Sequence, residues 1–328
     1  MKLTVLLDVH VAGQRGHEMV RVSQRPRLWR TLARVALVVA FISLTLHWYG
    51  AFCSSAQHVT RQATRIFEDT QSTRDDRLVA ARKPRIYVVA LTRSLDTWTS
   101  VEDASAYTLL LPSLERSLSS AEYARFDIRL LIAYDDDDKF WRQRINRDIA
   151  SRGRQIRVEF KCFRRHGKRL PFNEACALAF KMGAHYIVRV NDDTEFVSDG
   201  WLSAAIRTLE SFEPQNIGVV GPHCIGGSSR RFLTHDMVHR THINIFGTYY
   251  PPELDNWWVD DWISGVYGAS RTRQLTGWTV KHHTSAHGQR YTVDKSQSAL
   301  LPVVMHRGRK RLAEYLRNAS SEVIENVH

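Results

Sequence analysis

Between residues 85 and 220, short apolar runs alternate with segments in which apolar residues recur at helical spacing. Runs rich in β-branched and aliphatic residues predict β-strands, and they occupy residues 85–91, 127–133, 186–190 and 217–220. The helical spacing predicts α-helices over residues 107–118, 173–182 and 201–209. Strands that alternate with helices in this way predict an α/β domain, with a mainly parallel sheet flanked by helices.

The N-terminal part carries a segment of a different kind, an uninterrupted apolar run. Residues 35–53 contain no Asp, Glu, Lys or Arg over nineteen positions, close to the ~20 residues with which a helix crosses ~30 Å of hydrocarbon. The one awkward residue, His47, lies beside two aromatic residues, and an aromatic belt at the headgroup level would hold it at little cost. We therefore predict a single-pass transmembrane anchor over residues 35–56. A buried helix of a soluble domain is the alternative.

The charges that flank this run predict its orientation. Arginines crowd its N-terminal side, whereas serines and a glutamine follow it, so the positive-inside rule places residues 1–34 in the cytosol and the rest beyond the membrane. A cleaved signal peptide is less consistent, because more than thirty residues precede the run. We expect a type II protein of the Golgi membrane, or of the endoplasmic reticulum, with its C-terminal bulk in the lumen.

Three further segments complete the predicted organisation. Residues 57–83 are polar and lack strand-like alternation, which predicts a stem or linker; the folded domain is expected over residues 84–317, before a tail over residues 318–328. Asn318 opens an Asn-Ala-Ser glycosylation sequon, which is consistent with a lumenal glycoprotein. The cysteines of the lumenal part form no CxxC pair, which disfavours a zinc knuckle, and one disulfide among them is allowed. They are Cys162, Cys176 and Cys224.

The net charge of +12 has local causes. Residues 1–34 hold seven Lys and Arg against two acids, and residues 152–169 hold eight against one. Such an excess suits polyanionic partners, but the predicted anchor disfavours a nuclear nucleic-acid binder, and we expect no nucleic-acid partner. We interpret residues 152–169 as a solvated helix or strand face; the alternative is a contribution to pyrophosphate binding. The chain has no GxGxxG or P-loop pattern, which disfavours dinucleotide-binding enzymes and P-loop kinases.

Acidic clusters follow two of the predicted strands directly. One begins at Asp135, and the other is Asn191, Asp192 and Asp193. Ligands of open α/β sheets bind outside the carboxyl ends of the strands, and Asn191 and Asp193 point the same way from an extended chain. A hard divalent cation prefers such oxygen ligands and can bridge them to a diphosphate. An acidic turn with only a capping role is the alternative.

A second kind of cluster places paired aspartates among tryptophans. Asp260 and Asp261 lie between Trp257, Trp258 and Trp262. Indole walls partly desolvate a carboxylate, which raises its pKa and suits a general base, and the indole faces can stack on sugar rings. The alternative is the N-terminus of a helix that begins near Trp262. Both interpretations can hold, because one aspartate can cap while the other acts.

Three histidines, His282, His283 and His287, lie within six residues. Histidine is a competent ligand for Mn²⁺, and His283 follows Asp193 by ninety positions, as a long-range third ligand would. A lone histidine is usually structural, but the cluster favours a metal-binding role. Arg290 follows closely and could face a phosphate or a uracil.

In order and spacing these features resemble a Golgi-type glycosyltransferase of the GT-A fold, over roughly residues 83–294. Residues 132–138 (IAYDDDD) look like its nucleotide-base pocket, and residues 171–196 resemble its helix with an early asparagine, its strand and its DxD element. Residues 257–262 (WWVDDW) are similar to the acceptor segment of inverting members, where a histidine some twenty residues later often completes the metal shell. Asn191 stands where the family usually has its first Asp.

The resemblance implies a Rossmann-like GT-A domain that transfers a hexose or N-acetylhexosamine from a nucleotide-diphosphate donor, a UDP-sugar being expected. The acceptor would be a hydroxyl of a glycan, glycoprotein or glycolipid, with inversion at the anomeric carbon. The implied base is Asp261 or Asp260, and the implied Mn²⁺ or Mg²⁺ ligands are Asp193, Asn191 and either His283 or His282. The implied acceptor contacts are Trp257, Trp258 and Trp262. The implied nucleotide contacts are Asp135, Asp136, Asp137, Asn173, Arg189, Asp192 and Arg290.

A catalytically inactive membrane protein of the same fold, which binds sugar nucleotides or glycans, is the alternative function. Asn191 favours it, because the substitution removes one negative charge from the expected metal site. The tryptophan-flanked aspartates, Asp193 and the histidines favour the enzyme. A homodimer through the stem is compatible with the sequence.

Overall fold

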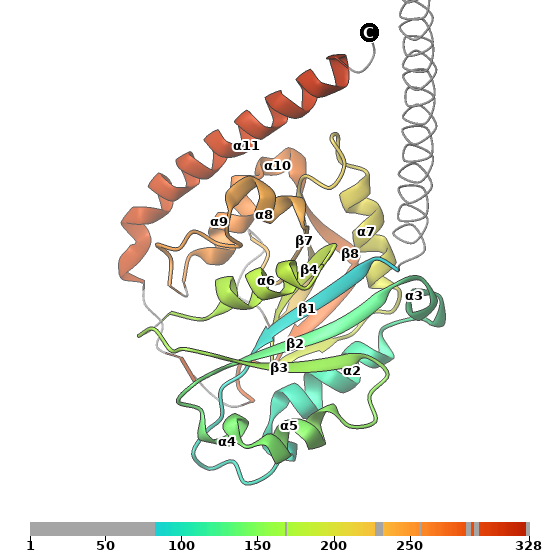
Figure 1. Ribbon diagram of the computed structural model, residues 1–328, viewed down its shortest axis with the longest axis vertical. Helices are drawn as coiled ribbons and strands as arrows, with labels where there is room; N and C mark the ends of the chain where they lie inside the picture. The colour runs from blue at the N-terminus through green and yellow to red at the C-terminus, as the bar shows by residue number, and fades with distance from the viewer. Residues whose placement is uncertain are drawn as a thin grey trace, which may run out of the picture. The chain divides into compact units, whose positions relative to one another are not determined.

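A single β-sheet, covered by helices on both faces, forms the framework of the structure (Figure 1). The computed structural model describes residues 83–325, except 168, 227–231, 256, 287–289 and 292–294. The predicted cytosolic tail and anchor, nearly all of the predicted stem, and His287 lie outside the described residues. Among the helices that are described, none is both long and apolar enough to span a bilayer.

Eight strands in the described part of the chain form the sheet, in the order β3-β2-β1-β4-β7-β6-β8-β5. β1, β2, β3 and β4 run parallel, β7 is antiparallel to both β4 and β6, β8 is parallel to β6, and β5 is antiparallel to β8. The predicted α/β sheet with flanking helices is therefore confirmed, but the parallel arrangement dominates only one half of it. The strands are β1 Arg85–Leu91, β2 Asp127–Asp135, β3 Arg157–Phe163, β4 Tyr186–Asn191, β5 Thr194–Phe196, β6 Val219–Ile225, β7 Asp236–His239 and β8 Thr272–His282.

Alternating side chains of the central strands face two separate helical layers, as the period of two requires. Tyr87, Val89 and Leu91 pack beneath α6, α8, α9 and α11, whereas Ile86 and Val88 pack against η2, α2 and α7. The first layer comprises α6 Phe172–Lys181, α8 Thr241–Phe246, α9 Val259–Val266 and α11 Leu300–Glu325. The second layer contains η2 Ala106–Leu110, α2 Leu111–Arg116 and α7 Trp201–Glu210. The remaining helices are η1 Val101–Asp103, α3 Ser120–Arg125, α4 Lys139–Arg142, α5 Arg144–Ser151, α10 Gly268–Arg271 and η3 Ser296–Ala299.

The strand order reverses between β1 and β4. From β1 the chain proceeds to β2 and β3 on one side and then returns to β4 on the other. Such a switch point leaves a crevice outside the carboxyl ends of the strands, and this is where open α/β sheets bind ligands. In the register of the sheet Leu91 lies beside both Ala133 and Asn191. The acidic residues that follow β2 and β4 therefore emerge at one edge.

A buried histidine, His242, ties α8 to the segment that leads towards α9. One ring nitrogen, Nε2, lies 2.7 Å from the carbonyl oxygen of Tyr249, and Nδ1 lies 2.8 Å from the hydroxyl of Tyr267. The carbonyl can only accept, so Nε2 donates to it, and a neutral ring then accepts from the tyrosine at Nδ1. Burial lowers the pKa of His242 to about 4.

We expect His242 to make the fold sensitive to acid. Because its pKa in the folded state lies below the ordinary value of about 6.5, its contribution is present above that value and is lost as the pH falls towards about 4. The full shift corresponds to roughly 3 kcal/mol. Urea unfolding between pH 7.5 and 4 should show the wild type losing more free energy of unfolding than the His242→Gln variant. Parallel pH dependences for the two proteins would contradict this.

Candidate active site

Asp192 lies buried at the switch point, between the ends of β1 and β4. The hydroxyl of Thr92 donates to its Oδ2 at 2.8 Å, and the two terminal nitrogens of Arg290 donate one to each carboxylate oxygen at 2.5 Å. Arg290 also donates to the carbonyl oxygen of Arg93 at 3.2 Å. Burial raises the pKa of Asp192, and Arg290 opposes that shift. Asp192 thus holds Arg290 in place, with its guanidinium 3.8 Å from the carboxylate of Asp193.

Asp193 presents an oxygen that is buried and accepts no well-aligned hydrogen bond, its Oδ1. This atom lies 3.0 Å from Nε2 of His282, and the side-chain amide of Asn191 lies 3.0 Å from the same nitrogen. Burial alone would raise the pKa of Asp193, but His282 and Arg290 favour its carboxylate and lower the pKa below the ordinary value. Three candidate ligands predicted from the sequence are thus brought together.

These three side chains fit a hard divalent cation. Neighbouring ligands of an octahedral ion at about 2.1 Å are separated by about 3 Å, which matches the two separations of 3.0 Å from Nε2 of His282. The buried Oδ1 of Asp193 supplies the charged ligand, and the amide of Asn191 can turn its oxygen inward. Within the described ranges no group of three or more His, Cys, Asp or Glu side chains could hold a metal ion, so the third protein ligand here would be an amide.

His283, the residue favoured by sequence spacing, is turned to a different partner. Its Nε2 lies 2.8 Å from Oε2 of Glu195, whereas His282 faces Asp193 because the pairing of β5 with β8 sets His282 opposite Thr194. His235, whose ring contacts that of His282, had no recognisable signal in the sequence. Its ring meets that of His282 edge-on at 5.4 Å, and its Nε2 lies 2.7 Å from the hydroxyl of Thr194.

The acidic cluster after β2 is largely neutralised by two arginines. Arg93 donates at 2.8 Å to Oδ2 of Asp135 and also grips Asp137, which receives a further hydrogen bond from Arg165 at 2.8 Å. The backbone nitrogen of Arg165 donates to Asp136. Asp135 nevertheless keeps a buried Oδ1 without a hydrogen-bond partner, and burial raises its pKa against the effect of Arg93. Within the cluster, Asp135 thus offers a buried acceptor without a partner and Asp136 an exposed one.

Arg189 does not point into the expected nucleotide site. It is 3% exposed and sits on β4 opposite Asp236 of β7. Its Nε donates to the hydroxyl of Tyr250 at 2.6 Å and lies 3.2 Å from Asp236, and one terminal nitrogen donates to the carbonyl oxygen of Thr234 at 2.8 Å. The other terminal nitrogen pairs with Asp260. This single guanidinium thus joins the carboxyl half of β4 to the first turn of α9.

The paired aspartates of α9 differ in their surroundings. Asp260 is engaged by Arg189; burial raises its pKa, and the guanidinium opposes the rise. Burial also raises the pKa of Asp261, opposed only by a hydrogen bond from its own backbone. No basic side chain of the described residues forms an ion pair with Asp261. Asp261 is therefore the aspartate with a carboxylate available for proton transfer.

The three tryptophans around this pair are not equivalent. Trp262 is buried and donates from Nε1 to the carbonyl oxygen of Val304, so its indole belongs to the core. Trp257 and Trp258 are partly exposed. The ammonium of Lys295 lies 4.9 Å from the ring centre of Trp257, and Nε1 of Trp258 donates to the Lys295 carbonyl at 3.4 Å. Only Trp257 and Trp258 can present an indole surface to a sugar.

Asn173 serves the backbone at the start of α6. Its amide nitrogen donates to the carbonyl oxygen of Tyr250 at 3.1 Å, and its amide oxygen accepts from the nitrogen of Tyr250 at 2.7 Å. Both polar atoms of the side chain are therefore occupied. The asparagine thereby fixes the backbone of Tyr250, whose hydroxyl accepts a hydrogen bond from Arg189.

No protein-family model and no curated protein sequence matches this chain. Among solved structures it is similar to S. aureus TarS 1–349, with 12% identity, a TM-score of 0.41 and coverage of 60% of each chain. It is also similar to GalNAc-T7 with UDP, GalNAc and Mn²⁺, with 10% identity, a TM-score of 0.44, and coverage of 62% of this chain and 44% of that one. A third is a putative nucleotide-diphospho-sugar transferase from Desulfovibrio desulfuricans G20, with 12% identity, a TM-score of 0.37, and coverage of 70% and 97%. The chain thus spans less than two thirds of the first two, and similarities of this degree establish neither a family nor an activity.

Proposed function

We propose that this chain is a glycosyltransferase that moves a hexose or N-acetylhexosamine from a nucleotide-diphosphate donor, a UDP-sugar, to an acceptor hydroxyl of a glycan, glycoprotein or glycolipid. The observation that carries the proposal is the group at the end of β4. There Oδ1 of Asp193 and the side-chain amide of Asn191 each lie 3.0 Å from Nε2 of His282, beside Arg290. A carboxylate, an amide and an imidazole next to a fixed guanidinium suit a cation-bridged diphosphate.

Each side chain has a role in this reaction. Mn²⁺ or Mg²⁺ bound by Asp193, Asn191 and His282 would neutralise the charge that builds on the leaving diphosphate. Arg290, held by Asp192, adds a positive charge beside it. Asp135 accepts a hydrogen bond from the nucleobase at its free Oδ1. These residues orient the donor so that its anomeric carbon faces the acceptor.

The acceptor side of the reaction belongs to α9. Asp261 takes the proton of the acceptor hydroxyl as that oxygen attacks the anomeric carbon, and the bond to the diphosphate oxygen breaks on the opposite face. The configuration inverts, because a single displacement occurs. The raised pKa of Asp261 favours proton uptake by its carboxylate. Trp257 and Trp258 offer stacking surfaces to the acceptor sugar.

The cellular setting is proposed from the sequence. An anchor over residues 35–56 would make this a single-pass type II protein of the Golgi membrane or the endoplasmic reticulum, with the described residues in the lumen. Asn318, the sequon residue, is exposed on α11, as a glycosylated residue must be.

The function is tested by UDP release. Full-length protein should release UDP from one member of a panel of UDP-hexoses and UDP-N-acetylhexosamines, and the rate should rise with Mn²⁺ and fall on chelation. Glycan mixtures added as acceptors should increase the rate further. Binding of UDP-sugars, with or without metal, but no release of UDP with any donor or acceptor, would instead support the alternative of an inactive binding protein.

A further inference from the structure

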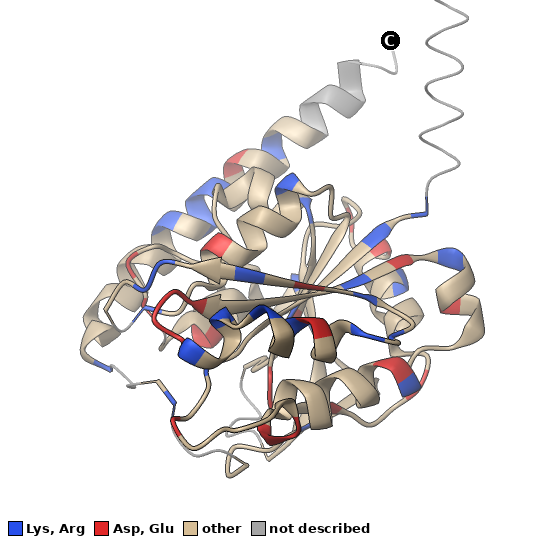
Figure 2. Ribbon diagram, turned by 60° about the horizontal axis from the view of Figure 1, so that its bottom comes forward, with Lys and Arg blue, Asp and Glu red and all other residues tan. Residues whose placement is uncertain are grey.

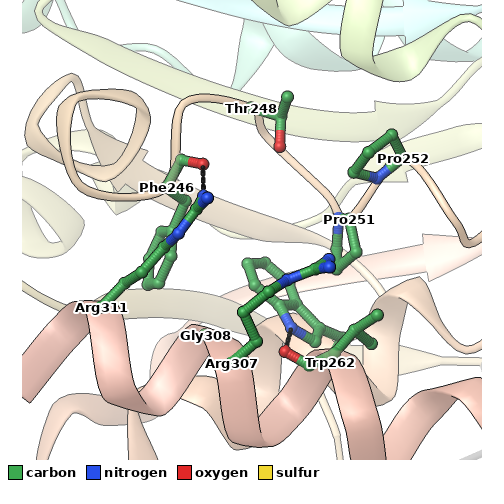
Figure 3. Close-up of a pocket in the computed structure, with 9 residues that line it drawn as sticks. Phe246, Thr248, Pro251, Pro252, Trp262, Arg307, Gly308 and Arg311 are labelled. Carbon is green, nitrogen blue, oxygen red and sulfur yellow. Dashed lines mark hydrogen bonds between the residues drawn. The ribbon is translucent and has the colours of Figure 1, made fainter.

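A small hollow separate from the strand-end site lies between α11, α9 and the segment that follows α8 (Figure 3). Its volume is about 30 Å³, and its apolar walls come from Phe246, Pro251, Trp262 and Val304. Nothing in the proposed reaction uses it. Trp262, which forms part of its wall, directly follows Asp261 in the sequence.

Two arginines of α11, Arg307 and Arg311, form the polar side of the hollow. They are four residues apart, so they project from the same face of the helix, and Figure 3 shows both reaching towards the segment at Thr248 and Pro251. Arg311 donates to the carbonyl oxygen of Phe246 at 2.7 Å, and Arg307 pairs with Glu253 at 2.6 Å. Two guanidiniums against one carboxylate leave the hollow with one excess positive charge.

Both arginines retain donors for a ligand. A guanidinium carries five N–H groups in a planar fork that matches a carboxylate or sulfate. Within the described residues, Arg307 and Arg311 each use few of these N–H groups. The side chain of Arg307 is 47% exposed. An oxyanion from solvent can therefore reach the pair.

The floor between the arginines is shaped by close packing of α11 on α9. Gly308 lies between them, and a Cβ there would come within 2.7 Å of Val266 and 3.3 Å of Trp262. A side chain at this position would push the two helices apart. The apolar lining residues Phe246, Trp262 and Val304 are at most 3% exposed, so a ligand would place only its oxyanion at the arginine pair and the rest outside the hollow.

The hollow shares a stretch of chain with the acceptor side of the proposed site. Two residues of its wall, Pro251 and Trp262, flank in the sequence the segment that contains Trp257, Trp258 and Asp261. Basic residues also recur along α11, as the blue segments of Figure 2 show, and Glu314 is the one acid between residues 306 and 317. An acidic acceptor would be attracted to this helix.

We propose that the hollow is a subsite for an anionic group of the acceptor, a sugar carboxylate or sulfate held by Arg307 and Arg311. This assignment rests on the proposed function, since it identifies the acceptor class as an acidic glycan. The two arginines would form charge-assisted hydrogen bonds with the oxyanion, and the sugar ring that carries it would lie outside the hollow.

Direct binding tests this without turnover. Titration calorimetry with full-length protein would use three probes: a carboxylated hexasaccharide, a sulfated hexasaccharide and neutral chitohexaose. We expect one or both acidic probes to bind more tightly than the neutral one, and Arg311→Gln to weaken that binding about tenfold or more. The matched control is Lys310→Gln, which removes an exposed charge of the same helix outside the hollow and should change the affinity less than about threefold.

The remaining outcomes separate the explanations. Equal losses in Arg311→Gln and Lys310→Gln would show a diffuse charge effect and overturn the subsite, as would equal binding of the neutral and acidic probes. Arg307→Gln provides a second variant should Arg311→Gln unfold, which circular dichroism would reveal. Absence of UDP release with intact acidic-glycan binding would refute the proposed enzyme and not the oxyanion subsite. UDP release without a preference for acidic glycans would do the reverse.

Discussion

Replacement of Asp193 by alanine is expected to reduce UDP release about a thousandfold or more, because it removes the charged ligand of the proposed cation site. The fold should survive, since Arg290 keeps both of its hydrogen bonds to Asp192, and the backbone oxygen of residue 193 still accepts from the backbone nitrogen of His283. Steady-state UDP release, Mn²⁺ binding by electron paramagnetic resonance and thermal unfolding would together measure the effect. Asp199→Ala is the matched control, because Asp199 is exposed a few residues further along the chain. Normal turnover in Asp193→Ala would contradict the metal assignment.

The two aspartates of α9 are expected to fail in different ways when changed to asparagine. Asp261→Asn should lower kcat by about a hundredfold or more, with little effect on the KM for the donor, because it removes the general base. Asp260→Asn should instead lower the free energy of unfolding by about 2 kcal/mol, since it takes one charged partner from the buried guanidinium of Arg189.

Measurements of kcat, KM and urea unfolding on both variants distinguish these effects. If Asp260→Asn remained fully stable yet lost the turnover that Asp261→Asn retained, the base would be Asp260. The wild-type rate should also increase with pH on the acidic side, through a pKa above the ordinary carboxyl value, because burial raises the pKa of Asp261. That limb should be absent from the residual activity of Asp261→Asn.

The central strands were predictable because they are buried and therefore consist mostly of apolar residues. The predicted strand at residues 85–91 matches β1, and the predicted strand at 186–190 lacks only the last residue of β4. β3 is different: it is an edge strand with exposed Arg157 and Lys161, so its basic residues indicated a solvated face without deciding between helix and strand. Exposed edge positions place little demand on hydrophobicity, and the pattern of β3 is correspondingly weak.

The antiparallel strand β7 also had no clear signal, since only four residues, Asp236–His239, form it. Two of its neighbours in the sheet, β4 and β6, come from earlier parts of the chain. Such pairing depends on contacts distant in sequence, and local periodicity does not encode it. This is why the sequence predicted a mainly parallel sheet, whereas the half of the observed sheet that contains β7 is mixed.

The candidate site could be predicted as far as the strand-end rule extends. That rule directed attention to Asp135 at the end of β2, and to Asn191 and Asp193 at and just beyond the end of β4; these two strands flank β1. It could not choose His282 over His283, because the register of β5 against β8 decides which ring faces Asp193. It also had no means of finding Arg93, whose pairing with Asp135 spans 42 positions.

The role of Arg189 was predicted differently from what its contacts show. The family resemblance implied a nucleotide contact for Arg189, but its guanidinium contacts Tyr250 and Asp260 of α9. Alternation along β4 places Arg189 on the same face as the buried Ile187, and so inside the helical layer. The alternation of side chains along the strand was therefore the available signal that Arg189 faces the helical layer.

The guanidinium beneath α9 also limits how this scaffold can be re-engineered. A chimaera that exchanges the loop and helix around residues 248–266 for those of another protein would need to retain a carboxylate at position 260. Without it, the arginine of the recipient sheet would keep Asp236 as its ionic partner but lose its tie to the transplanted helix. Grafts confined to the outer face of α11 avoid that junction, and they are the safer route to a protein with altered substrate preference.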